Sequence, residues 1–452
     1  MKLGSLLKNK TVKNASWIIG GKVVHMLLSF FVGIFTARYL GPANQGLIDY
    51  ASAYTIIFHS ICTLGIDSII VKNYIDHPDE QGETLGTAIV LRLISSLISV
   101  GLILGIVAVM DKGEKITLIV VALYSLSVIF NVFDSFGSWF QNRLQSKYPT
   151  IATLIGYVAV SIYRIILLIT RKNVYWFSLS LTLDYVVIAI FLFIVYKKSG
   201  GPRLSFSKEK AKQLLKSSYH FILSGLMIAV YNATDKWMLK QLIGNAEDAL
   251  AEVGFYGRAN MLCTMWCFVL GAIITSVTPT IMRLHKTDTE LFEKRNRQLY
   301  AVIFYVSTFV SVLFLFLSDW LIPFLYGVEY APASNPLKIL TWLTAFSYIG
   351  VARNIWIVCE EKQNYLKYLY LVAAIGNVAL NLVFIPIMGA SGAALASVIT
   401  QVLTAIVIPM FIKPLRKNTK MILEGIILKG VIPKRKKVAI DNSSGDNTDE
   451  EN

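Results

Sequence analysis

Ionisable side chains interrupt the long apolar stretches of this sequence. They are Lys22, Asp67, Arg92, Asp134, Arg164, Asp184, Asp235, Lys236, Arg258 and Arg353. A charged side chain at the centre of a membrane helix costs at least ~2.5–3.5 kcal/mol, so such residues normally face a polar interior, where they pair or bind a ligand. Each of these residues is therefore a candidate for a polar site inside a membrane protein.

The cations fall at two depths when a rise of ~1.5 Å per residue is applied along each helix. An inner basic tier contains Lys22, Arg92 and Arg353, and an outer basic tier contains Lys236 and Arg258. A cavity lined by cations can replace water around an anion, and arginine can bind phosphate through two hydrogen bonds at once. The predicted substrate-binding residues are these cations and two nearby acids: Lys22, Arg92, Arg258, Arg353, Lys236, Asp67 and Asp235.

Pairing among the charges is the alternative to a substrate site. The candidate pairs are Arg164 with Asp184, Asp67 with Lys22 or Arg92, and Lys236 with its neighbour Asp235. Cations outnumber the acids available to pair, which favours cavity lining for the basic tiers. Asp49 is interpreted as a helix-start residue near the outer mouth of the cavity. Asp67, Asp134 and Asp235 are also candidate ion sites.

The bulk composition indicates a membrane protein. The chain has 452 residues, of which 55% are hydrophobic and 16% are charged, and its mean hydropathy is +0.58. Soluble domains are about 45–50% apolar and about 25% charged. The net charge of +15 would suggest nucleic acid for a soluble protein, but basic loops on the cytoplasmic side of a membrane explain it here. We expect contact with the lipid bilayer and no nucleic-acid partner.

The apolar stretches divide into twelve helical spans, each near the ~20 residues that a bilayer core requires. The turn signal Gly41-Pro42 separates the first two. The predicted spans are 14–38, 47–71, 85–110, 116–140, 150–170, 174–196, 219–243, 253–281, 300–326, 336–359, 365–388 and 392–412. The predicted fold is all-α, a polytopic membrane protein with about 12 transmembrane helices.

Lys and Arg residues are unevenly divided between the loops on the two sides of the membrane: one side has about four for each one on the other side. The positive-inside rule therefore predicts that both termini are cytoplasmic. The longest break between spans is basic and divides them six and six. The predicted parts are an N-terminal half at 1–196, a basic cytoplasmic linker at 197–218, a C-terminal half at 219–412, and a cytoplasmic tail at 413–452 whose end is disordered.

The two halves resemble each other in sequence. GLIDYASAY, which begins at Gly46, aligns with GFYGRANML, which begins at Gly254, and Ala51 then falls on Ala259. Similarly, IGYVAVSI from Ile155 aligns with IGNVALNL. The aligned segments are six spans apart. Because six is an even number, equivalent helices of the two halves cross the membrane in the same direction. This predicts that the halves are parallel repeats, related by a pseudo-two-fold axis around a central cavity. Chance similarity between apolar segments is the alternative.

Three motifs carry a resemblance to a known family. They are TARYLGPANQG at the end of the first span, IPFLYGVEYAPAS after the ninth, and LNLVFIPIMGASGAALASVIT across the last two. The chain resembles the polysaccharide and oligosaccharide (O-antigen-type) flippases of the multidrug/oligosaccharidyl-lipid/polysaccharide exporter superfamily over nearly its whole length. The resemblance implies translocation of undecaprenyl-diphosphate-linked oligosaccharide units to the outer leaflet of a bacterial inner membrane. A polysaccharide polymerase and chain-length machinery are the implied partners.

Two other functions compete with this expectation. A cation-coupled multidrug exporter of the same superfamily would place acids in its cavity, whereas bases dominate in this sequence. A membrane enzyme of polysaccharide assembly, such as a polymerase, would need a long catalytic outer loop, and the sequence has none. The sequence also lacks GxxxxGK[ST], HExxH and CxxC patterns, and the four cysteines lie in apolar segments. We therefore expect a protein that is not an enzyme and has no cofactor or metal.

Overall fold

The structure, a computed structural model, describes residues 10–431, and every regular element in that range is a helix. The predicted all-α fold is thereby confirmed. The predicted disordered end of the tail lies outside the described residues.

The helices vary widely in length, and short 3₁₀ or π turns join several of them. The α-helices are α2 (Lys10–Cys62), α3 (Asp67–Asp76), α4 (Gln81–Met110), α5 (Lys115–Asn131), α6 (Ser135–Asn142), α7 (Lys147–Ile169), α8 (Val174–Lys198), α9 (Lys208–Leu242), α10 (Ala246–Met265), α11 (Phe268–Thr287), α12 (Thr289–Tyr326), α13 (Ser334–Cys359), α14 (Leu366–Val402), α15 (Ile408–Phe411) and α16 (Arg416–Ile426). The turns are η1 (Pro78–Glu80), η2 (Val132–Asp134), η3 (Val328–Ala333), η4 (Gln363–Tyr365) and the π turn η5 (Leu403–Val407).

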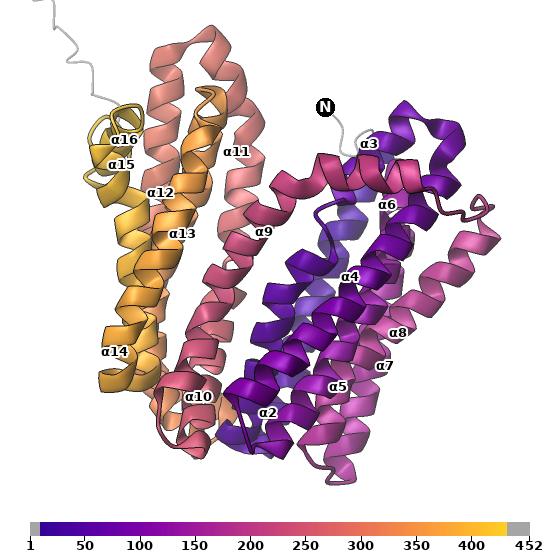
Figure 1. Cartoon of the computed structure of the whole chain (residues 1–452). Coiled ribbons are helices and arrows are strands. Elements are labelled where there is room, and N and C mark those ends of the chain that lie inside the picture. Colours follow the sequence, from indigo (N-terminus) through magenta and orange to yellow (C-terminus); the bar gives the residue numbers. More distant parts are fainter. Residues whose placement is uncertain (1–9, 432–452) are drawn as a thin grey trace, which may run out of the picture.

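Nine stretches within residues 10–431 are long and apolar enough to cross a membrane. Two of them contain a reversal of the chain: one in α2 at Gly41 (φ 73°) and one in α14 at Gly389 (φ 55°). Positive φ values of this kind favour glycine, which has no Cβ to clash. The more polar α9 also runs through the bundle (Figure 1). Counted this way, the helices agree with the twelve predicted spans.

Predicted span two (47–71) is wrong in its last third, because the helix stops between α2 and α3. Leu64 and Gly65 have φ values of 52° and 58°, which end the helical path. The break exposes the carbonyl oxygen of Thr63, and the guanidinium of Arg92 donates two hydrogen bonds to it, at 3.0 and 3.2 Å. A charged side chain from a neighbouring helix therefore satisfies the interrupted backbone.

Predicted span eight (253–281) is wrong in its boundaries, since it consists of two helices, α10 and α11, and begins seven residues earlier than expected. The side chain of Asn245 caps α10 by accepting a hydrogen bond from the Glu247 N–H at 3.0 Å. Acidic residues fill the first turn of α10, where they interact favourably with the helix dipole. A search for apolar runs does not detect this polar first turn.

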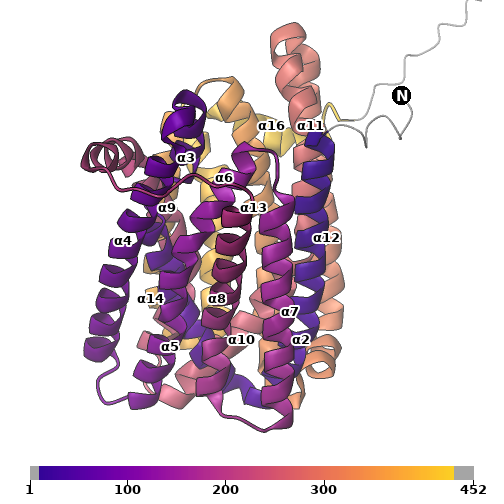
Figure 2. The same ribbon diagram turned by 90° about the vertical axis from the view of Figure 1, so that its right-hand side faces the viewer.

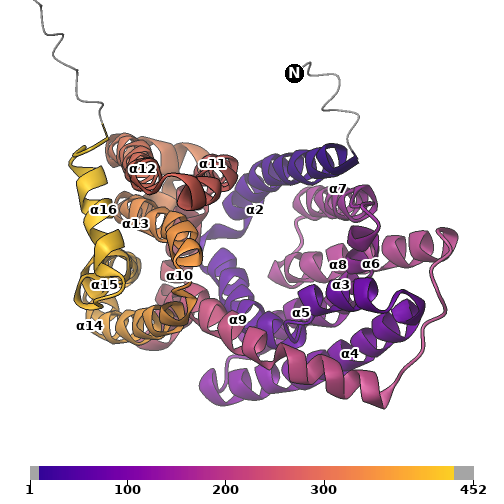
Figure 3. The ribbon, with the colours of Figure 1, turned by 90° about the horizontal axis from the view of Figure 1, so that it is seen from above.

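Helices α2–α8 and helices α10–α16 form two groups, and α9 lies between them (Figures 1 and 3). The groups converge at one end and diverge at the other end, where α3 and α11 stand apart, one in each group (Figures 1 and 2). We call the first end the closed end; it contains residues 41–46, 111–114, 170–173, 243–246 and 327–333. We call the opposite end the basic end; it contains residues 143–147, 197–208 and 360–366.

At the closed end, α2 and α10 touch backbone to backbone. A Cβ atom built on Gly46 would lie 1.7 Å from the carbonyl oxygen of Leu250, and one built on Gly254 would lie 2.3 Å from the carbonyl oxygen of Pro42. Each glycine meets the residue four positions before the other, so the contact is reciprocal, as expected around a local two-fold axis. These are the glycines that the internal alignment superimposed. The two-fold relation of the complete halves stays a prediction.

The segment between α8 and α9 is fixed along α4 at the basic end. A Cβ atom on Gly86 would lie 2.4 Å from the carbonyl oxygen of Ser205, and the Ser207 N–H donates to Thr87 Oγ1 at 3.0 Å. Helix α9 starts at this point, crosses above α4 and then turns into the bundle (Figure 1). On this path, one face of α9 contacts the first group and the opposite face contacts the second group. The division of the chain into two halves joined by residues 197–218 stays a prediction.

Candidate functional site

Asp49 on α2 joins the two groups at the closed end. Its carboxylate accepts hydrogen bonds from Arg258 Nη2 on α10 at 3.0 and 3.3 Å, and it lies 3.7 Å from the ammonium of Lys236 on α9. The three side chains are only 9–13% exposed. One nearly buried carboxylate therefore balances both cations of the predicted outer tier. The interpretation of Asp49 as a helix-start residue is wrong.

A second cluster ties α9 to the loop after α4. Lys240 Nζ lies 2.7 Å from Glu114 and 3.9 Å from Asp111. The Gln241 amide donates to Asp111 at 3.0 Å and to the Tyr50 hydroxyl at 2.9 Å, and Tyr50 donates to Asp111 at 2.8 Å. Burial raises the pKa of Asp111 above its ordinary value, and these donors and the lysine oppose that rise. The two clusters together connect α9 to the first group at the closed end.

Direct contacts between the two groups strengthen the same end. Arg38 Nε donates to the carbonyl oxygen of Leu325 at 2.6 Å, and Tyr330 donates to the carbonyl oxygen of Ala37 at 3.0 Å. The packed core that surrounds these contacts contains side chains from both groups. The structure therefore represents a conformation that is sealed at the closed end.

Arg92 on α4 organises the first group toward the basic end. It is 2% exposed, and besides the Thr63 carbonyl it binds Asp67 Oδ1 at 2.7 Å and Ser135 Oγ at 2.8 Å. The Asp67 side chain is 58% exposed, so this is a half-exposed ion pair on a buried arginine. The alternative that Asp67 pairs with Arg92 is confirmed.

Arg92→Met is expected to destabilise the fold by about 2–3 kcal/mol, because it removes two hydrogen bonds to the Thr63 carbonyl, leaves the buried Ser135 hydroxyl without its donor and removes the partner of Asp67. The midpoint of thermal unfolding of the purified protein should fall by several degrees. Arg143→Met is the matched control: Arg143 is exposed and its guanidinium stacks 3.9 Å from the centre of the Trp139 ring. An Arg92→Met protein of unchanged stability that no longer binds substrate would instead assign Arg92 to the substrate.

Lys22 faces a cavity of about 590 Å³ near the basic end. The wall of the cavity also contains His25, Asp67, Asp134 and Gln141. Lys22 is exposed, and among residues 10–431 no carboxylate oxygen lies within 4 Å of its ammonium. The first group therefore offers a cation that is not held in an ion pair.

Arg353 lies in a separate cavity of about 330 Å³ in the second group, with Tyr231 and Gln401 in its wall. It is 5% exposed, and its Nη1 donates to the carbonyl oxygens of Thr404 at 2.8 Å and Ala405 at 3.5 Å. Those carbonyls belong to the π turn η5, where the regular helical hydrogen bonds are disturbed. Within the described chain, Arg353 has no carboxylate partner.

Asp235 is embedded in neutral hydrogen-bond donors of the second group. It is 4% exposed and accepts hydrogen bonds from Tyr256 at 2.5 Å, Ser397 at 2.6 Å and Asn381 at 2.7 Å. These donors come from α10 and from both arms of α14. The proposed pairing of Asp235 with Lys236 is wrong, since the two side chains point to opposite groups.

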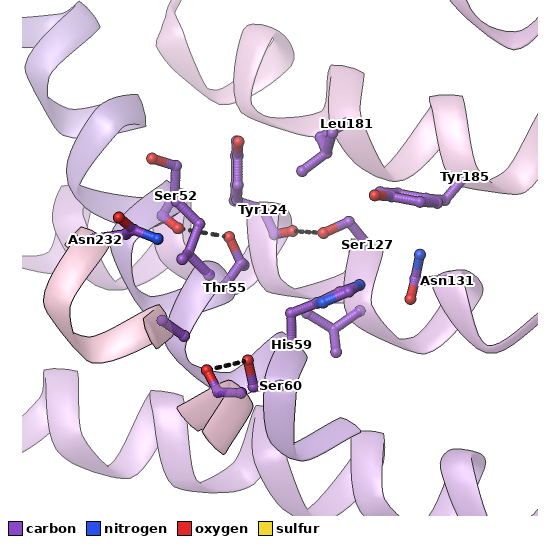
Figure 4. A pocket seen from close by; sticks show the side chains of 14 residues that line it. Ser52, Thr55, His59, Ser60, Tyr124, Ser127, Asn131, Leu181, Tyr185 and Asn232 are labelled. Atoms are coloured by element: carbon purple, nitrogen blue, oxygen red, sulfur yellow. Dashed lines mark hydrogen bonds between the residues drawn. The ribbon is translucent and has the colours of Figure 1, made fainter. Parts of the chain in front are cut away.

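A third cavity, of about 530 Å³, lies between α9 and the first group. Hydroxyl, amide and aromatic side chains line it, and none of its lining residues is Asp, Glu, Lys or Arg (Figure 4). The polar lining residues are Ser52, Thr55, His59, Ser60, Tyr124, Ser127, Asn131, Tyr185 and Asn232. Asn232 also lines the cavity of Arg353, so α9 separates the two cavities.

The structure brings some predicted site residues together and separates others. The outer tier is one cluster, whereas Lys22 and Arg353 of the inner tier lie in different groups and Arg92 is used structurally. Arg164 and Asp184 interact electrostatically, but Arg164 Nε and Asp184 Oδ1 have no hydrogen-bond partner, and the described residues contain no ion pair between these two side chains. Contact with substrate stays a prediction for every one of these residues. Sequence reasoning missed the role of Asp49. The excess of cations over acids in the membrane spans was a signal that any further acid near the outer tier could be their partner. Sequence reasoning also missed the uncharged cavity, whose residues give no comparable signal in the sequence.

Comparison with known proteins identifies the family of the chain and its fold. A family model described as polysaccharide biosynthesis protein matches residues 11–285, more than half of the chain. The capsular polysaccharide biosynthesis protein CapF of Staphylococcus aureus is 24% identical over 401 residues, which cover 86% of this chain and 96% of CapF.

Two solved structures share the fold. One is the lipid II flippase MurJ in an inward closed conformation, with a TM-score of 0.69 and 15% identity over 92% of this chain and 91% of MurJ. The other is a multidrug resistance MATE family transporter of the MOP superfamily in an inward-facing conformation, with a TM-score of 0.66 and 15% identity over 88% of this chain and 96% of the transporter. The described helices therefore form the multi-pass fold of these transporters.

Proposed function

Because the chain belongs to the polysaccharide biosynthesis protein family, we propose that it is a flippase that moves a polyprenyl-diphosphate-linked oligosaccharide across the membrane. The observation that carries the proposal is the placement of Lys22 and Arg353, one in each helix group, each in a cavity and each without a carboxylate partner in the described chain. A lipid diphosphate is a multiply charged anion, and unpaired cations can replace the water around it.

Alternating access supplies the route. The clusters of Asp49 and of Asp111 seal the closed end, and the substrate enters from the basic end. Breaking these clusters while the basic end closes would release the substrate on the opposite side. The polyprenyl tail stays in the lipid throughout, since burying apolar chain in lipid costs nothing.

The basic end faces the cytoplasm in this proposal, because cytoplasmic loops carry excess Lys and Arg. Both termini are then cytoplasmic and the membrane is a bacterial inner membrane. The protein carries out transport and no catalysis, and a polysaccharide polymerase acts on its product. An ion or proton gradient, or consumption of the product, drives the cycle.

The proposal predicts that transport depends on both unpaired cations. We would reconstitute the purified protein in liposomes that contain a fluorescent undecaprenyl-diphosphate oligosaccharide, and follow its exposure to an impermeant quencher. Lys22→Gln and Arg353→Gln should each slow transport by about 10-fold or more, because each removes a charge-assisted hydrogen bond to phosphate. Arg353→Lys should restore part of the rate. Lys172→Gln, at an exposed position of the closed end, should have no effect.

The rival functions give different results in the same liposomes. Export of a cationic dye by a protein that does not move the lipid would favour a cation-coupled multidrug exporter. Lengthening of the oligosaccharide would reveal a polymerase. Transport of the lipid that survives both glutamine substitutions would retain the flippase function and remove the two cations from its mechanism.

A further inference from the structure

We propose that the uncharged cavity between α9 and the first group is the binding site for a neutral sugar of the substrate. This inference rests on the proposed flippase function and assigns one part of the substrate to one place in the protein. The cavity volume of about 530 Å³ lies within the ~300–1,000 Å³ of small-molecule sites, and it is far larger than an ion requires. Its chemistry decides which part of the substrate fits.

The hydroxyl groups of the cavity are arranged as acceptors. Four of them donate their own protons to main-chain carbonyl oxygens at 2.6–3.1 Å: Ser52 to Asp49, Thr55 to Ser52, Ser60 to Gly225, and Ser127 to Tyr124. Each hydroxyl oxygen retains lone pairs that can accept another hydrogen bond. A ligand that presents several hydroxyl donors satisfies these oxygens, and a sugar ring does so on each of its carbons.

The other side chains complete the match to a sugar. The amides of Asn131 and Asn232, on opposite sides of the cavity (Figure 4), can each donate and accept. The rings of Tyr124 and Tyr185 offer flat apolar faces beside polar hydroxyls, which suit the C–H face and the edge of a pyranose. A purely apolar ligand would leave all of these polar groups unsatisfied.

The absence of lining charges excludes the diphosphate from this cavity, because an anion removed from water needs a counter-charge. Charged clusters border the cavity instead. Toward the closed end, the Lys236 ammonium lies 3.4 Å from Ser52 Oγ. Toward the basic end, Asn131 is followed three residues later by Asp134, which lines the cavity of Lys22. A sugar in the uncharged cavity and a phosphate near Lys22 would therefore be neighbours.

The position along the helices fits a transport site. The lining residues come from the second half of the second arm of α2, from the second half of α5, from the middle of α8, and from the part of α9 that runs through the bundle (Figure 1). In transporters built from repeats, substrate binds near the membrane midplane between the repeats. The cavity is lined by the first group and by α9, which lies between the two groups (Figure 3), so a bound sugar would contact the helix that separates them.

The test compares two lipids of equal charge that differ in the sugar: a polyprenyl diphosphate whose terminal phosphate is capped by a methyl ester (the bare lipid), and the same lipid carrying one N-acetylhexosamine in place of the methyl group. We would measure Kd for both with the full-length protein in nanodiscs. The wild type should bind the sugar-bearing lipid about tenfold more tightly, the effect of one or two good hydrogen bonds. Ala229→Leu, which fills the cavity wall, should remove most of that advantage, and Thr55→Val, which deletes an acceptor without changing shape, should reduce it about threefold. Neither should change the Kd of the bare lipid.

Thr36→Val is the matched control, since Thr36 is buried on the same helix and lies outside the cavity; it should leave both Kd values unchanged. Thr55→Val carries the test if Ala229→Leu does not fold. An equal Kd for the two lipids, or a sugar advantage that survives both substitutions, would overturn this inference and leave the flippase function in place. Failure of the wild type to bind either lipid would overturn the flippase function, and this inference with it.

Discussion

Asp49→Asn is expected to weaken the seal at the closed end by about 3–5 kcal/mol, because it leaves two nearly buried cations without a carboxylate. Arg258 and Lys236 are 9% and 13% exposed, so water does not replace the lost partner. A shift of about 3 kcal/mol changes the ratio of closed to open conformations by more than 100-fold. Transport should fall accordingly, since the protein can no longer hold the conformation that receives substrate.

Spin labels at Lys112 and Val328 would measure this opening, because both positions are exposed at the closed end on opposite groups. The distance between the labels should increase in Asp49→Asn. Asp319→Asn is the matched control: Asp319 forms a 2.7 Å ion pair with Lys338, but its side chain is 68% exposed, and such pairs contribute about 0–1 kcal/mol. An unchanged distance in Asp49→Asn would show that the seal does not depend on this carboxylate.

Gly46→Ala is expected to abolish transport even though it adds a single methyl group. The new Cβ would lie 1.7 Å from the carbonyl oxygen of Leu250 and 2.7 Å from its carbon. Backbone atoms cannot avoid a clash by changing rotamer, so α2 and α10 must move apart and the closed end cannot seal. We expect a loss of transport of 100-fold or more, in line with the ~3 kcal/mol scale of overpacking at a close contact.

The same liposome assay and the same spin labels test this prediction. Gly254→Ala should have a similar effect from the other side of the contact, at 2.3 Å from the carbonyl oxygen of Pro42. The double variant should be little worse than either single one, since both disturb one contact. Gly20→Ala, on α2 with no heavy atom within 4 Å, should be neutral. Full transport by Gly46→Ala would contradict the proposed seal.

The sequence by itself determined the class, the number of spans and the positions of the membrane charges. A charge within an apolar run is visible locally, because the cost of placing it in lipid does not depend on the neighbouring helices. The glycines at residues 46 and 254 could also be paired from the sequence, because the segments that contain them align with each other. The spans failed where polar signals interrupted or preceded them, at the break after α2 and at the capped start of α10.

Only the tertiary structure decided which charges are free. Asp49 binds Arg258, which is 209 residues away in the sequence. Arg92 donates to the Thr63 carbonyl at the break between α2 and α3. Neither contact follows from local composition. The uncharged cavity depended even more on the fold. Its Ser, Thr, Asn and Tyr residues are common types from four helices, and each is unremarkable in its own segment. They become a site only because helix packing places their acceptors and amides around one space and keeps every charge outside it.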